Sequence, residues 1–122
     1  MRHLEVTLAA LLACGVVLPG TALAACPGNT QLEINDCAAS AYRDADAQLN
    51  AVWPAARAAA AASGADGLLL DAQRKWIAFR DAACAAEAAQ YRGGSIQPLV
   101  HADCLRRLTD RRTADLRALL PQ

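Results

Sequence analysis

The sequence predicts an all-α fold, a compact arrangement of three helices in which a long helical hairpin precedes a third helix and two disulfides staple the bundle. Apolar residues recur at three- and four-residue steps through most of the chain, and no stretch alternates with period two for long enough to form a strand. Alanine, the strongest helix former, accounts for 31 of the 122 residues. That length allows one domain.

The first 24 residues are expected to be an export signal. Met1 to His3 supply a short basic start, residues 6–17 form an uncharged apolar run, and Ala22-Leu23-Ala24 has the small-x-small form of a cleavage site. The apolar run is shorter than the roughly 20 residues that span a bilayer, so no membrane span is expected. The sequence therefore predicts a signal peptide over residues 1–24, a helical domain over residues 25–122, and a periplasmic or secreted location.

Residues 23–26 (Leu-Ala-Ala-Cys) also fit a lipoprotein box, in which Cys26 would carry a lipid anchor. The cysteine count favours ordinary export. Removing the signal discards Cys14 and leaves an even set for an oxidising compartment, whereas lipidation would leave one odd thiol. The set consists of Cys26, Cys37, Cys84 and Cys104.

The first helix is predicted to begin with a capping box, in which Thr30 is the N-cap and Glu33 follows three residues later. Pro54 is expected to kink this helix or to end its regular part, because proline lacks the amide hydrogen and crowds the preceding turn. An alanine-rich stretch, residues 55–62, follows it. One apolar face runs along the helix through Ile34, Ala38, Ala41, Ala45, Leu49, Val52 and Ala56.

A second helix is predicted from Asp66, as its cap, to about Gln90. Trp76 and Phe79 are expected to supply most of the large apolar surface of an alanine-rich core. Arg80 and Asp81 lie close to that core on the same helix. We expect both charges to be tied into a salt-bridge and capping network, because a charge near a core needs a partner.

Gly93-Gly94-Ser95 is expected to end the second helix, and Pro98 to start the third, since proline is preformed for a first helical turn. The third helix has an apolar side made of Val100, Cys104, Leu108, Leu116 and Leu119.

The composition argues against several classes of function. Twelve basic and twelve acidic residues leave no net charge, whereas nucleic-acid binding needs a basic excess. The domain after the signal holds one histidine, His101, so a nucleophile would have few bases to activate it. Its cysteines are 11, 47 and 20 residues apart, without the close pair that is typical of zinc sites. We therefore expect neither an enzyme nor a cofactor or metal site.

Charge is shared unevenly between the two halves of this domain. Residues 25–73 hold six acidic and two basic side chains, and residues 74–122 hold five acidic and nine basic ones. Either helices of opposite sign neutralise each other by packing together, which we favour, or the protein offers acidic and basic faces to a partner.

The segment Gln73 to Cys84 is the most distinctive in the chain, and with it the sequence resembles the LprI-type family of lysozyme inhibitors. The resemblance spans nearly the whole mature chain and includes the four cysteines. It implies an all-helical, disulfide-stapled envelope protein, some of whose relatives inhibit lysozyme, but it transfers no inhibitory residue. Pro54 stands where the family usually continues its helix. The matching stretches are Thr30–Ala38, Tyr42–Asn50, Gln73–Cys84, Tyr91–Ser95 and Cys104–Arg112.

Four cysteines allow three pairings. In a hairpin centred near Ser63, the heights of the cysteines along the helices favour Cys37 with Cys84, and Cys26 with Cys104. The competing set pairs Cys84 with Cys104 across the glycine turn and Cys26 with Cys37.

Two devices for blocking a lysozyme follow from charge placement. The turn of Arg92, Gly93, Gly94 and Ser95 is a candidate partner-binding element whose arginine would pair with carboxylates in the enzyme's cleft. Alternatively, the acidic first helix would steer a basic enzyme. The predicted function is a lysozyme inhibitor, and the alternative is a structural or interaction module of the cell envelope that binds another envelope protein.

Overall fold

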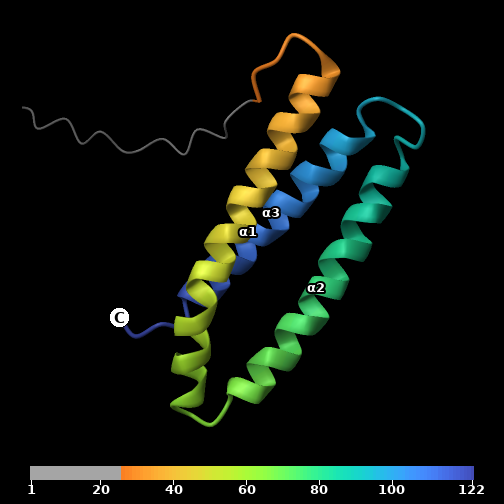
Figure 1. Ribbon diagram of the computed structural model, residues 1–122. Helices are drawn as coiled ribbons and strands as arrows, with labels where there is room; N and C mark the ends of the chain where they lie inside the picture. Colours follow the sequence, from red (N-terminus) through yellow and green to blue (C-terminus); the bar gives the residue numbers. More distant parts are fainter. Residues whose placement is uncertain (1–25) are drawn as a thin grey trace, which may run out of the picture.

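The computed structural model describes residues 26–122, and the predicted signal peptide lies outside this range. These residues form three helices, α1 (Gln31–Ala61), α2 (Asp66–Ala89) and α3 (Gln97–Arg117), and contain no strand. The short α1–α2 connection lies at one end of the molecule, and the α2–α3 turn lies at the other end together with the start of α1 (Figure 1). The all-α, three-helix prediction is confirmed.

None of the three helices is both long enough and apolar enough to cross a membrane, a statement that covers residues 26–122.

The capping box at the start of α1 is present as predicted. The Glu33 backbone N–H donates to Thr30 Oγ1 at 3.2 Å, and the backbone N–H groups of Asn29 and Thr30 donate to Glu33 Oε2 at 2.7 and 3.1 Å. These backbone donors hold the pKa of Glu33 below its ordinary value. Three backbone donors that lack helical partners are thereby satisfied.

Helix α1 runs through Pro54 and ends at Ala61, so proline does not terminate it. Packing on both sides of the proline accounts for the continuation of the helix. Val52 and Trp53 pack against the cluster that contains Leu116, and Ala56 is fully buried in that cluster. Tertiary contacts of this kind commonly outweigh local propensity.

The start of α2 differs from the prediction. Ala65 occupies the N-cap without a side-chain hydrogen bond, and Asp66 is the first helical residue. The Asp66 carboxylate instead accepts a hydrogen bond from Arg57 Nη2 of α1 at 2.9 Å, which ties the two arms of the hairpin together. Helix α3 begins at Gln97 with Pro98 in its first turn.

Two apolar clusters form the core. The first consists of Leu49, Ala56 and Leu116, with Val52, Trp53, Leu69 and Trp76 packed against it. The second consists of Cys84, Cys104 and Leu105, with Tyr42 and Leu108 around them. Helix α3 packs closely against α1 and also contacts α2, so it connects the three helices into one bundle.

Phe79 is not a core residue, because its side chain is 61 % exposed. The face of α2 that meets the bundle carries Leu69, Gln73, Trp76, Arg80 and Cys84. Successive helical residues are turned by about 100°, so Phe79 falls outside that face. Trp76 packs against the core as expected, and the stem of buried Arg80, rather than Phe79, lies beside it on that face.

Candidate partner-binding surface

The predicted binding turn projects from one end of the bundle (Figure 1). Arg92, Gly93, Gly94 and Ser95 are all exposed. Gly93 has φ of +80°, a conformation that other residues rarely adopt, so it enables the reversal between α2 and α3. The Gly94 N–H donates to the Tyr91 carbonyl at 2.9 Å and closes the turn.

Hydrogen bonds from both sides anchor this turn. Asn35 Nδ2, from the second turn of α1, donates to the Ser95 carbonyl at 3.0 Å, and Asn35 Oδ1 accepts from Gln31 Nε2 at 2.8 Å. The Gly93 N–H donates to Gln97 Oε1 at 3.3 Å. Arg92 has no acidic partner within residues 26–122, so its guanidinium is free to bind a carboxylate of another molecule.

Both disulfides stabilise this same end, but their pairing is the competing set, and the pairing that we favoured from the sequence is wrong. Cys26 is bonded to Cys37 with Cα atoms 5.5 Å apart, and Cys84 is bonded to Cys104 with Cα atoms 5.4 Å apart. Two cysteines at similar heights along a helical hairpin are neighbours only if their side chains also face each other. Cys84 faces α3 rather than α1, and the segment before α1 folds back along that helix.

The acidic side chains of α1 contribute unequally to a surface field. Asp36 and Asp44 are exposed, and within residues 26–122 neither has an ion-pair partner. Glu33 is held by the capping box, although it keeps its charge, and Asp46 accepts from Asn50 and lies 4.0 Å from Arg80.

Arg80 is buried at the junction of the three helices. It is 8 % exposed, its guanidinium carbon lies 5.1 Å from the centre of the Trp76 ring, and Nη2 lies 2.9 Å from Asp81 Oδ1. Asp46 approaches it from α1, and Thr109 Oγ1 of α3 lies 3.4 Å from Nη1. The motif residues Trp76, Arg80 and Asp81 thus meet in one cluster that holds the bundle together.

Several members of this cluster were not singled out from the sequence. The ring of Tyr42 also lies near Arg80, with its centre 5.6 Å from the guanidinium carbon, and burial raises the pKa of the Tyr42 hydroxyl. Arg112 lies 5.8 Å from the Trp76 ring centre and donates to buried Gln73 at 2.8 Å. In the sequence, Tyr42 and Asp46 are one helical turn apart, and this spacing indicates that their side chains lie on the same face of α1.

The neutralisation that we favoured for the two charged halves occurs in only a few places. Asp46 of the acidic half meets Arg80 of the basic half, and Asp71 pairs with Lys75 at 2.7 Å within α2. The remaining ion pairs join side chains of the same half, such as Arg107 with Glu87 at 2.7 Å. Much of the acidic excess of residues 25–73 and of the basic excess of residues 74–122 is therefore not neutralised by contact between the two halves.

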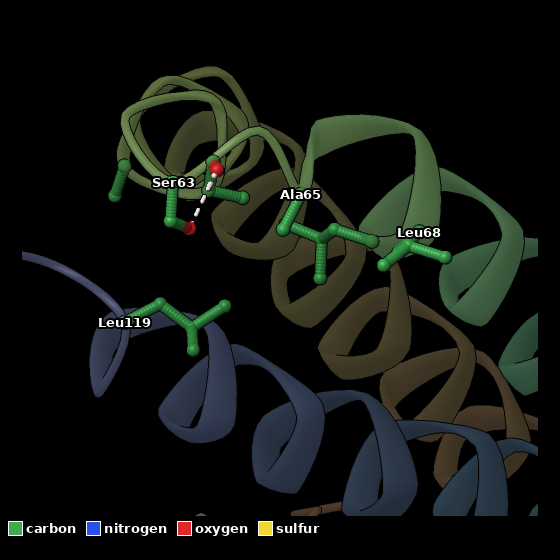
Figure 2. A pocket seen from close by; sticks show the side chains of 7 residues that line it. Ser63, Ala65, Leu68 and Leu119 are labelled. Atoms are coloured by element: carbon green, nitrogen blue, oxygen red, sulfur yellow. Dashed lines mark hydrogen bonds between the residues drawn. The ribbon is translucent and has the colours of Figure 1, made fainter.

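The opposite end of the bundle has an open, mostly aliphatic depression of about 410 Å³. Leu119 faces Ser63, Ala65 and Leu68 across it, and the Ser63 hydroxyl is turned to the Ala60 carbonyl at 3.1 Å (Figure 2). None of the residues between 26 and 122 that line it has a titratable side chain, so they offer no group for acid–base chemistry. Within the described part of the chain, no cluster of His, Cys, Asp or Glu is placed to hold a metal ion.

Comparisons with known proteins point to one family. Residues 24–116 match the family model described as "Lysozyme inhibitor LprI". The chain is also similar to "Uncharacterized protein R02472" from Rhizobium meliloti (strain 1021), with 39 % identity over 103 residues that cover 75 % of this chain and 74 % of the relative. No solved structure matches significantly.

Proposed function

This chain belongs to the lysozyme inhibitor LprI family, and from that membership we propose that it is an exported protein that binds a lysozyme and blocks it stoichiometrically. The family match over residues 24–116 is the observation that carries the proposal. The inhibitor acts by binding alone and needs neither cofactor nor metal.

The anchored turn at Arg92 is the element that we assign to the enzyme's cleft. Lysozymes cleave with a pair of carboxyl groups, one of which is ionised in the resting enzyme. Arg92 offers a guanidinium that is unpaired within residues 26–122 on an exposed turn, and a guanidinium binds a carboxylate through two parallel hydrogen bonds. Because Asn35 and the Cys84–Cys104 disulfide already hold the turn, little conformational freedom is lost on binding.

The acidic side chains of α1 supply the second device. Lysozymes are usually strongly basic, and the exposed Asp36 and Asp44 would attract such an enzyme over a distance of about a Debye length. Attraction of this kind raises the association rate and weakens as salt is added. The two devices therefore differ in a measurable way.

Two variants separate these contributions. We expect Arg92→Ala to lower inhibition about tenfold or more, chiefly by faster dissociation, because it removes a charge-assisted contact at the centre of the interface. We expect Asp36→Lys with Asp44→Lys to slow association at low salt and to leave dissociation nearly unchanged. Arg74→Ala, an exposed arginine on α2, is the matched control. Unchanged kinetics in both variants would eliminate both devices.

We propose ordinary export rather than lipid anchoring. In the folded domain the Cys26 sulfur is bonded to Cys37, and a sulfur in a disulfide is unavailable for a thioether to lipid. Mass spectrometry of the exported protein should give an unlipidated chain with two disulfides. A mass increase from an acyl-glyceryl group on Cys26 would contradict this assignment.

The function itself is tested by mixing the purified, oxidised protein with a panel of lysozymes of different types and following the lysis of cell walls by turbidity. We expect at least one lysozyme to be inhibited. If none is inhibited and the protein captures another envelope protein instead, the alternative of an envelope interaction module holds.

A further inference from the structure

Helix α2 carries a second apolar stripe on an exposed side, whose first member, Leu68, also lines the depression at the end of the bundle. Its members follow one another at alternating steps of four and three residues, and all are exposed, including Leu68 at 75 % and Phe79 at 61 %. Lys75 is the only charged member. We call this set the outer α2 stripe, and it consists of Leu68, Ala72, Lys75, Phe79, Ala82 and Ala86.

We propose that the outer α2 stripe is a dimer interface, in which α2 of one copy packs antiparallel against α2 of a second copy. A two-fold axis makes each contact occur twice. A stripe that is complementary to the same stripe running in the opposite direction therefore makes each of its favourable contacts twice. The outer α2 stripe has this property. When Lys75 is placed opposite Phe79 of the second copy, Ala72 falls opposite Ala82 and Leu68 falls opposite Ala86.

The central contact is one between a cation and an aromatic ring. The Lys75 ammonium would lie over the ring of Phe79 of the second copy, and the symmetry repeats this contact. Asp71 remains 2.7 Å from Lys75 in each copy and offsets the repulsion between the two ammonium groups. The alanines on either side let the two helices approach closely, as small side chains at a helix contact do.

The charge of the whole chain permits this pairing. Its twelve basic and twelve acidic residues leave no net charge, so two copies do not repel each other, and proteins near zero net charge tend to associate. The antiparallel arrangement also points the two Arg92 turns in opposite directions. Each copy would remain free to bind its own enzyme, so the dimer is compatible with the proposed inhibition but does not depend on it.

Analytical ultracentrifugation of the oxidised, signal-free protein from micromolar to millimolar concentration tests the interface without any lysozyme. We expect a monomer–dimer equilibrium that Phe79→Ala weakens by about tenfold or more, since two ring contacts are lost. Ile77→Ala, an exposed apolar residue on the opposite side of α2, should leave it unchanged. A monomer at all concentrations would overturn the proposal. So would a Phe79→Ala variant that loses lysozyme binding while its association state stays that of the parent.

A charge variant tests the central contact. Lys75→Glu should weaken the dimer as much as Phe79→Ala does, because it places an anion over the ring. Arg74→Glu changes the net charge equally from outside the stripe and should leave the dimer intact. Equal weakening by both charge variants would contradict the proposed contact.

Cross-linking tests the register. Cysteines introduced together at Ala72 and Ala82 lie about 15 Å apart along their own helix, too far to bond within one chain, yet they lie opposite each other across the proposed axis. Mild oxidation should therefore yield a covalent dimer on a non-reducing gel. The pair Ala78→Cys with Ala85→Cys, exposed outside the stripe, should not. The proposed register would be overturned if both cysteine pairs cross-linked equally, or if the pair at positions 72 and 82 did not cross-link.

Discussion

At the scale of single residues, Arg80 shows how an alanine-rich bundle gains a specific core. Five of the ten buried apolar residues are alanines, so the long stem of Arg80 and the ring of Trp76 fill space that larger apolar residues would fill elsewhere. The guanidinium reaches groups on all three helices: Asp46 on α1, Asp81 on α2 and Thr109 on α3. One side chain thus fixes how the helices lie against one another.

We expect Arg80→Ala to lower the free energy of unfolding by about 2–4 kcal/mol, because it removes packing around the stem and two contacts with aromatic rings. Asp46 and Asp81 are about half exposed, so water can solvate them once the arginine is gone, and this keeps the loss moderate. Urea unfolding followed by circular dichroism measures it. Asp81→Ala removes a carboxylate that is more than half exposed and leaves the buried guanidinium near Asp46 and Thr109, so it should cost less, about 1–2 kcal/mol. Equal losses in the two variants would contradict the central role of Arg80.

Glu33 makes the stability of the helix start depend on pH. Its folded pKa is lowered by the backbone donors of Asn29 and Thr30, from an ordinary value of 4.5. The stabilisation is therefore fully present above pH 4.5 and is lost as the pH falls through the lower folded pKa. We expect Glu33→Gln to be less stable than the parent at neutral pH and the difference to shrink in acid. Urea unfolding across this range measures it, and a constant difference would contradict the assignment.

At the scale of helices, the Cys84–Cys104 disulfide joins α2 to α3 and closes a loop that contains the Arg92 turn. Closing a loop of about 20 residues stabilises a fold by roughly 3 kcal/mol, mainly by restricting the unfolded chain. Replacing both cysteines by alanine should lower stability by about 2–4 kcal/mol and weaken inhibition, because the turn is then less ordered before binding. Thermal unfolding and inhibition assays test the two effects. Full inhibition by a folded double variant would show that the disulfide does not preorganise the turn.

The positions of the helices along the chain could be predicted from the sequence, but the contacts between the helices could not. The capping box at Thr30 and Glu33 and the start of α3 near Pro98 depend on neighbours in the chain, so local pattern sufficed. The course of α1 through Pro54 depends on Leu116, which lies far along the chain. The disulfide pairing depends on whether α2 faces α1 or α3. An apolar stripe on one helix does not indicate which other helix packs against it.

At the scale of the whole molecule, the two ends of the bundle differ in kind. In the part of the chain that the structure describes, one end holds both disulfides, the anchored turn and the unpaired Arg92, whereas the other holds an aliphatic depression without titratable groups (Figures 1 and 2). The turn of residues 92–95 could be proposed from the sequence because glycine and arginine stand out there. Its rigidity could not, since the Asn35 contact joins residues that are 60 positions apart.

The most direct test of the account is a titration of a susceptible lysozyme with the oxidised, signal-free protein, at enzyme concentrations well above the dissociation constant. We predict that activity falls linearly and reaches its minimum at one inhibitor chain per enzyme, and that Arg92→Ala loses this sharp end point. If no lysozyme in the panel loses activity even with the protein in large excess, the central claim of stoichiometric inhibition is contradicted.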